Sequence, residues 1–326
     1  MIRSLRSFYG VGFIGLLMTI AVLTISGCGS SAQRQEGPPA DADLARFNGA
    51  ARQAFDAGLL RQAEKFYRMA LDQAYLRDDT GAILDARYNL AVCLMNLQSY
   101  EEALAVVQYG YAEMRLAGRG RSVDYLLLEA TILHRRGVLD DARQITDQIL
   151  SASIPESAVI HRQTHFLRGL IAAEQDDLDG LRAAIIALGQ PEELQLRADR
   201  QELLGRLAMA EQNWDAAGSA FDSAADLRRE ALDYREMVRA LAWGGKANEK
   251  AEHHREAGIR YLRAGRSAFL QNQFDDARKW LNQAAQLAET AGDDQIIQEA
   301  LSYLQEIEAL TAAAPEGSGE KKISEE

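Results

Sequence analysis

The sequence predicts an all-α protein in which helical hairpins repeat and stack into a superhelix. No window of residues 43–310 alternates apolar and polar side chains with period two for long, which argues against strands. The same segment contains only two prolines, Pro155 and Pro191, and is rich in Ala, Leu, Arg, Glu and Gln. At roughly 270 residues it is large for one compact core. We therefore expect a repeat architecture.

A phrase of side chains recurs along this segment. It consists of an aromatic residue or Leu, two polar residues, Ala, a bulky residue four positions on, and a small or apolar residue three positions later. The anchor positions lie 40, 39, 39, 36 and 40 residues apart, at Ala63, Ala103, Ala142, Leu181, Ala217 and Ala257. Twelve residues before each anchor is a second small residue, at Ala51, Ala91, Ala130, Gly169, Gly205 and Gly245. Small side chains at both places let the paired helices of a hairpin approach closely.

Two copies carry a family resemblance most clearly. They are Asn89-Leu90-Ala91 with Tyr100 to Leu104, and Leu203-Leu204-Gly205 with Trp214 to Ala224. This pattern resembles the tetratricopeptide repeat, which implies a right-handed α-α superhelix of about six to seven helical hairpins. The period of about 39 residues exceeds the usual 34, so we expect longer helices. A further phrase, Phe274 to Ala284, follows Ala257 too soon for a whole hairpin and leaves the last register open.

The first 28 residues resemble a bacterial lipoprotein signal. Arg3 and Arg6 form a basic start, residues 8–25 are apolar, and Ile25-Ser26-Gly27-Cys28 resembles the lipobox that is cut before its Cys. The resemblance implies that residues 1–27 are removed and that Cys28 is lipidated, which would anchor the chain to a membrane. Two alternatives are an uncleaved signal anchor and a plain secretory signal with an incidental Cys.

The flanking segments differ in composition from the repeat domain. Residues 28–42 and 311–326 are rich in small, polar, Pro and Gly residues, so we expect a flexible tether and a disordered tail around a domain at residues 43–310. Gly29 and Ser30 follow Cys28 without an Asp. In a Gram-negative host this implies outer-membrane residence, facing the periplasm.

Charge and cysteine content exclude several functions. The formal net charge is −12, and loss of Arg3 and Arg6 with the signal would make it −14. Such a charge argues against nucleic acid as a partner and against general adsorption to anionic lipid. The chain has two cysteines, Cys28 and Cys93, which excludes a disulfide scaffold and a Cys-based metal site. We expect Cys93 to be a buried small hydrophobe.

The expected binding surface is the concave face, where side chains of the first helix of each hairpin form a groove. Six of the twelve predicted groove residues are basic, so we expect an acidic or carboxylate-ended protein segment as the ligand. The alternative is that these are ordinary solvated helix positions. The predicted groove residues are Asn48, Arg52, Tyr88, Asn96, Thr131, His134, Arg135, Phe166, Arg206, Arg239, Lys246 and Lys250.

Candidate catalytic and metal motifs are incomplete. His161 and His165 are four residues apart, but Arg162 stands where a zincin has Glu. Residues 176–180 hint at a calcium loop but fit better as a turn between helices. Residues 243–247 lack the flanking residues of a phosphate-binding loop.

Two hypotheses follow, and neither includes a cofactor or metal. The favoured one is a non-enzymatic scaffold lipoprotein that holds cell-envelope proteins. The alternative is a ligand-binding or catalytic solenoid, for which His161, His165 and residues 176–179 would be the place to look.

Overall fold

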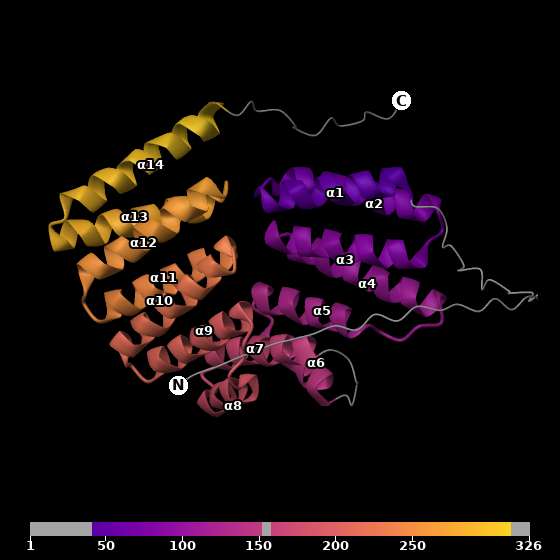
Figure 1. Ribbon diagram of the computed structural model, residues 1–326, viewed down its shortest axis with the longest axis horizontal. Coiled ribbons are helices and arrows are strands. Elements are labelled where there is room, and N and C mark those ends of the chain that lie inside the picture. The colour runs from indigo at the N-terminus through magenta and orange to yellow at the C-terminus, as the bar shows by residue number, and fades with distance from the viewer. Residues whose placement is uncertain (1–40, 152–157, 314–326) are drawn as a thin grey trace, which may run out of the picture. The chain divides into compact units, whose positions relative to one another are not determined.

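The computed structural model describes residues 41–151 and 158–313, and in these residues all regular structure is helical (Figure 1). The predicted signal peptide, Cys28, residues 28–40 of the tether and the tail from residue 314 lie outside the described residues. The helices are α1 (Ala42–Asp56), α2 (Leu60–Leu76), α3 (Thr80–Asn96), α4 (Tyr100–Leu116), α5 (Val123–Arg136), α6 (Leu139–Ser151), α7 (Ala158–Glu174), α8 (Leu178–Leu188), α9 (Leu194–Ala210), α10 (Trp214–Glu230), α11 (Tyr234–Lys250), α12 (His254–Leu270), α13 (Phe274–Ala291) and α14 (Asp294–Ala313).

Consecutive helices pair into seven hairpins over the described ranges, and each hairpin packs against the next. The expected all-α helical-repeat solenoid is therefore confirmed. The structure also shows how the last repeat begins, because α13 and α14 form a seventh hairpin that starts at Phe274. Helix α14 continues to Ala313, three residues beyond the predicted domain boundary. None of the described helices is both long enough and apolar enough to span a bilayer.

Three-residue turns with a left-handed middle residue end most of the helices. Seven such residues are not glycine, and their φ angles lie between 52° and 60°: Asp78, Gln98, Asp176, Gln212, Leu232, Glu252 and Asn272. The reversed backbone lets the next N–H bond back to the helix end, as Ser99 N does to the Leu94 carbonyl at 2.9 Å. Asp177 then caps α8, accepting from Gly180 N at 2.8 Å. Residues 175–177 thus form the turn between α7 and α8, and residues 178–180 are the first turn of α8, as the prediction of a turn with Asp near the next helix start requires.

Small residues let the helices of a hairpin approach as predicted. A Cβ at Gly205 would lie 2.8 Å from carbons of the Phe221 ring, and one at Gly245 would lie 2.9 Å from the Tyr261 ring. The anchors Ala103 and Ala217 are fully buried. A side chain larger than the native one has no room at these positions. The recurring spacing in the sequence is thus the spacing of close contacts between helices.

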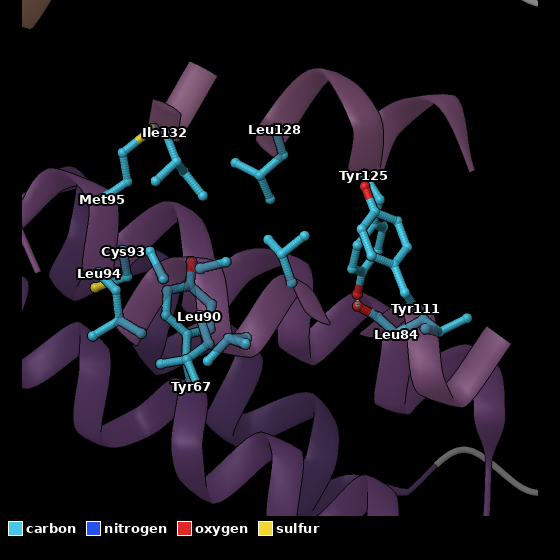
Figure 2. Close-up of a cluster of buried hydrophobic side chains, with 14 of the residues drawn as sticks. Tyr67, Leu84, Leu90, Cys93, Leu94, Met95, Tyr111, Tyr125, Leu128 and Ile132 are labelled. Carbon is cyan, nitrogen blue, oxygen red and sulfur yellow. Dashed lines mark hydrogen bonds between the residues drawn. The ribbon is translucent and has the colours of Figure 1, made fainter. Parts of the chain in front are cut away.

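The core of the first hairpins combines aliphatic side chains with buried tyrosines (Figure 2). The Tyr125 hydroxyl donates to the Leu84 carbonyl at 2.6 Å, and the Tyr111 hydroxyl donates to Glu129 at 2.8 Å. Cys93 is fully buried in the same cluster, which confirms its predicted place in the core. Burial raises the pKa of its thiol to about 11, so the thiol stays protonated at neutral pH.

Candidate functional site

A partly enclosed cavity of about 950 Å³ lies along the inner face of the repeat. Its walls come mainly from the first helix of each hairpin from the second to the seventh, namely α3, α5, α7, α9, α11 and α13, together with the turns before α2, α4 and α13. The second helices contribute fewer residues: the start of α2 and of α4, and Arg228 of α10. The volume is within the range of pockets that hold a small ligand or a short peptide.

Eight of the twelve predicted groove residues line this cavity: Tyr88, Asn96, Thr131, His134, Arg135, Phe166, Arg206 and Arg239. The other four do not line it: Asn48, Arg52, Lys246 and Lys250. Helix α1 contributes no residue to the lining, and α11 contributes only residues from its first two turns. Lys246 and Lys250 belong to the last two turns of α11, where both are exposed. Binding of a partner at any of the twelve stays a prediction.

The cavity is bounded where the first hairpins meet α11 and the turn before α13. Asn272 Nδ2 donates to the Ala57 carbonyl at 3.1 Å, across 215 residues of sequence. The backbone at Gly58 is close to Gln271, because a Cβ on Gly58 would lie 2.1 Å from the Gln271 carbonyl oxygen. A third contact joins α5 to α11, where Arg135 Nη2 lies 3.5 Å from Glu236 Oε1. These contacts join parts of the chain that no local pattern relates.

One wall of the cavity is apolar and aromatic. It includes Tyr88 and Val92 of α3, Phe166 and Leu170 of α7, and Trp280 of α13. Trp280 stacks on Tyr261, with ring centroids 5.6 Å apart and 9° between the planes. Such a wall offers apolar contact to a side chain or an aliphatic ligand.

Charged side chains of α9 and α11 that line the cavity belong to an ion-pair network built on Glu202, which is only 1% exposed and does not itself line the cavity. Glu202 Oε2 accepts from Arg239 Nη2 at 2.9 Å, and Arg206 Nη2 lies 3.5 Å from its Oε1. Burial disfavours the ionised form of Glu202, but Arg239 and Arg206 hold its pKa below the ordinary value. Arg239 also pairs with Glu236 at 2.6 Å. Each predicted groove arginine that lines the cavity is therefore already opposed by a carboxylate, so the expected excess of basic charge is not there.

Arg206 and Arg239 each keep a buried Nε without a hydrogen-bond partner, and of the two Arg206 has the weaker bond to Glu202. The Arg206 side chain is 9% exposed. The guanidinium lies 3.7 Å from the centroid of the Trp243 ring, which supports it from one side. Burial lowers the pKa of Arg206. A ligand carboxylate is the group that best satisfies a buried guanidinium with an open donor.

The sequence analysis did not predict the acidic residues of this ion-pair network. The predicted groove contains none of Asp199, Glu202 and Glu236. Asp199 pairs with Arg228 in the interior. Burial raises the pKa of Asp199 to about 6, against the opposing effect of Arg228. A signal existed in the spacing, since Glu202 precedes Arg206 by one helical turn and the two side chains share a face.

The residues of the alternative hypothesis lie elsewhere. His161 and His165 are on α7, and neither lines the cavity. Burial and the neighbouring His161 lower the pKa of His165. Within the described ranges, no three His, Cys, Asp or Glu side chains come together in a way that could hold a metal ion. The cavity histidine is His134, whose Nε2 lies 3.1 Å from Glu174 Oε1.

No protein-family model matches this chain, and neither does any curated protein. A tetratricopeptide repeat protein from Parabacteroides merdae aligns over 80% of this chain and 100% of its own, with 13% identity and a TM-score of 0.43. The apo form of RapI aligns over 83% and 77%, with 12% identity and a TM-score of 0.48. The TPR2AB-domain of yeast Sti1, in a complex with pHSP90, aligns over 79% and 98%, with 17% identity and a TM-score of 0.33. The assignment of the fold rests on the chain's own helices.

Proposed function

We propose that this protein is a non-enzymatic scaffold, anchored to a membrane through a lipidated Cys28, that binds an extended segment of a partner protein in its central cavity. The observation that carries the proposal is the cavity of about 950 Å³, whose lining combines apolar and aromatic side chains with charged ones. An extended peptide can offer both apolar and polar side chains to such a lining. The lipobox-like sequence supports a partner in the bacterial envelope, and Gly29 and Ser30 after Cys28 support outer-membrane residence in a Gram-negative host.

The chemistry of the partner segment follows from Arg206. The cavity arginines are mostly neutralised within the protein, so a polyanionic segment gains little from overall charge. A single acidic side chain or chain-terminal carboxylate can instead approach the guanidinium of Arg206, which lines the cavity and has an unpaired buried Nε, while apolar neighbours contact Phe166 and Trp280. We therefore propose a segment with one carboxylate flanked by apolar residues.

Site-specific photocrosslinking in intact cells tests this function. A photoreactive amino acid at Thr131, in the cavity, should crosslink a defined envelope protein, whereas one at the exposed Ser219 of α10 should not. Arg206→Gln should remove the Thr131 crosslink because the ligand carboxylate loses its partner. The matched control is Arg229→Gln, an exposed arginine outside the cavity. Equal crosslinks from Thr131 and Ser219, or an adduct that survives Arg206→Gln, would contradict the proposal.

The anchor has its own test. Cys28→Ala should leave an uncut precursor, because the peptidase acts only after the Cys has been lipidated. Recovery of unlipidated mature protein from wild-type membranes would contradict the anchor while leaving the cavity proposal standing. Sucrose-gradient fractionation would then locate the anchored protein in the outer or the inner membrane.

A further inference from the structure

Three arginines without ion pairs lie within seven residues of sequence at the end of the second hairpin. Arg115, Arg119 and Arg121 are all exposed, and none of them forms a salt bridge within the part of the chain that the structure describes. No acidic residue lies between Glu113 and Asp124. In a chain with a net charge of −12, this is an unneutralised basic segment.

Exposed apolar side chains accompany these arginines. Leu116, the last residue of α4, is 85% exposed, and Leu76, at the equivalent end of α2, is 81% exposed. Arg87 lies between two more exposed rings, 5.5 Å from the centroid of Tyr75 and 5.2 Å from that of Tyr109. We call the set the arginine–leucine edge: Tyr75, Leu76, Tyr109, Arg115, Leu116, Arg119 and Arg121.

This edge lies beside the residue where the described chain begins. Asp41 Oδ2 accepts from Gln73 Nε2 at 2.9 Å and pairs with Arg77 Nη1 at 3.6 Å. Gln73 and Arg77 flank Tyr75 and Leu76 in α2 and its C-cap. Asp41 is thirteen positions after Cys28 in the sequence. Even fully extended, this stretch spans at most about 45 Å, so an anchored Cys28 keeps this edge close to the bilayer.

We propose that the arginine–leucine edge docks on the anionic surface of the bilayer that holds Cys28. The inference rests on the lipid anchor of the proposed function and adds an orientation to it. Arginine and tyrosine place polar tips among headgroups while leucine enters the boundary of the acyl chains. The remaining acidic surface is repelled by the same lipids, so the edge faces the membrane and the domain is held in one orientation. Charge complementarity and the site of attachment therefore select the same surface.

The test uses the full, lipidated chain in vesicles. An environment-sensitive NBD label on Ala117→Cys reports contact of the edge with lipid, since Cys93 is buried and does not compete for the label. The control label is on Ser219→Cys of α10. In vesicles that contain phosphatidylglycerol, emission from residue 117 should rise and shift to the blue relative to phosphatidylcholine vesicles. Emission from residue 219 should stay the same.

A charge variant and flotation separate the two proposals. Combining Arg115→Gln, Arg119→Gln and Arg121→Gln should abolish the change at residue 117, as should salt near 1 M, where the screening length is about 3 Å. The variant should float with vesicles as the wild type does, because the acyl chains are untouched. Co-flotation without a lipid-dependent change at residue 117 would overturn the edge alone. Failure of the wild type to float would overturn the anchor and, with it, the docking.

Discussion

Arg235, the second residue of α11, donates from Nη1 to Oδ1 of Asn96, the last residue of α3, at 2.9 Å and across 139 residues of sequence. Asn96 is held for this contact because its Nδ2 donates to the Val92 carbonyl at 2.8 Å. The Arg235 guanidinium also lies 5.6 Å from the Phe55 ring centroid. One side chain thus connects helices of three hairpins at the edge of the cavity, where the curvature of the solenoid brings its two halves together.

Removing the contact between Arg235 and Asn96 should separate the two halves of the solenoid, whereas the stability of the fold should fall only moderately. For Arg235→Ala we expect a larger radius of gyration in small-angle scattering, with a loss of about 1 to 2 kcal/mol in the free energy of unfolding. Asn96→Ala should act in the same way, and the double variant should lose little more than either single one. Arg229→Ala, at an exposed position, is the control. An unchanged radius of gyration would show that other contacts hold the closure.

Replacement of glycine by alanine should have opposite effects on the free energy of unfolding at Gly205 and at Gly49. Gly205→Ala places a methyl group against the fully buried Phe221 ring, and overpacking of this kind lowers the free energy of unfolding by about 1 to 3 kcal/mol. Gly49→Ala in α1 meets nothing within 4 Å and should raise it by about 0.5 to 1 kcal/mol through helix propensity. Urea denaturation measures both changes. Equal effects would mean that α9 and α10 do not approach as described.

The buried carboxylate of Glu202 should contribute more to the stability of the fold than exposed carboxylates do. Glu202→Gln leaves Arg206 and Arg239 without their shared charge, and loss of one partner in a buried pair destabilises by about 3 to 5 kcal/mol. Glu256→Gln, exposed in the first turn of α12, should change stability by less than about 0.5 kcal/mol. Chemical denaturation at neutral pH makes the comparison, and similar losses for the two variants would contradict the ion-pair network.

The same pair predicts a pH dependence. Because the pKa of folded Glu202 is below its ordinary value of 4.5, its ionisation contributes stability above that pH and the contribution is lost as the pH falls below it. The difference in unfolding free energy between the wild type and Glu202→Gln should therefore shrink in acid. A difference that stays constant from pH 7 to about 3 would argue against a lowered pKa.

Cys93 should resist thiol reagents while the protein is folded. Its pKa of about 11 and its full burial leave almost no accessible thiolate at pH 8, so labelling should require unfolding. Since the pKa of the folded thiol exceeds its ordinary value of 9.0, stability should fall as the pH rises from 9 through 11, and less so in Cys93→Ala. Peptide mapping after timed alkylation, with and without urea, measures the first effect. Rapid native labelling would contradict it.

The sequence by itself determined the repeated unit and most of the residues on its inner face. The recurring phrase placed Ala103, Ala217 and Gly205 at close helix contacts, because hairpin packing depends on residues a short distance apart in the chain. It also put Tyr88 and Arg206 on the inner side of their helices. The lipobox-like sequence at Cys28 is likewise an inference from the sequence alone.

Only the tertiary structure decided where the cavity lies and how it is charged. Small rotations between neighbours add up over seven hairpins, and their sum brings Arg235 to Asn96 and Asn272 to Ala57. That sum cannot be obtained from spacing within one repeat. For the same reason, Lys246 is outside the cavity, at the far end of α11. The predicted groove arginines that line the cavity are paired with Glu202 or Glu236, because packing and burial determine which charges meet.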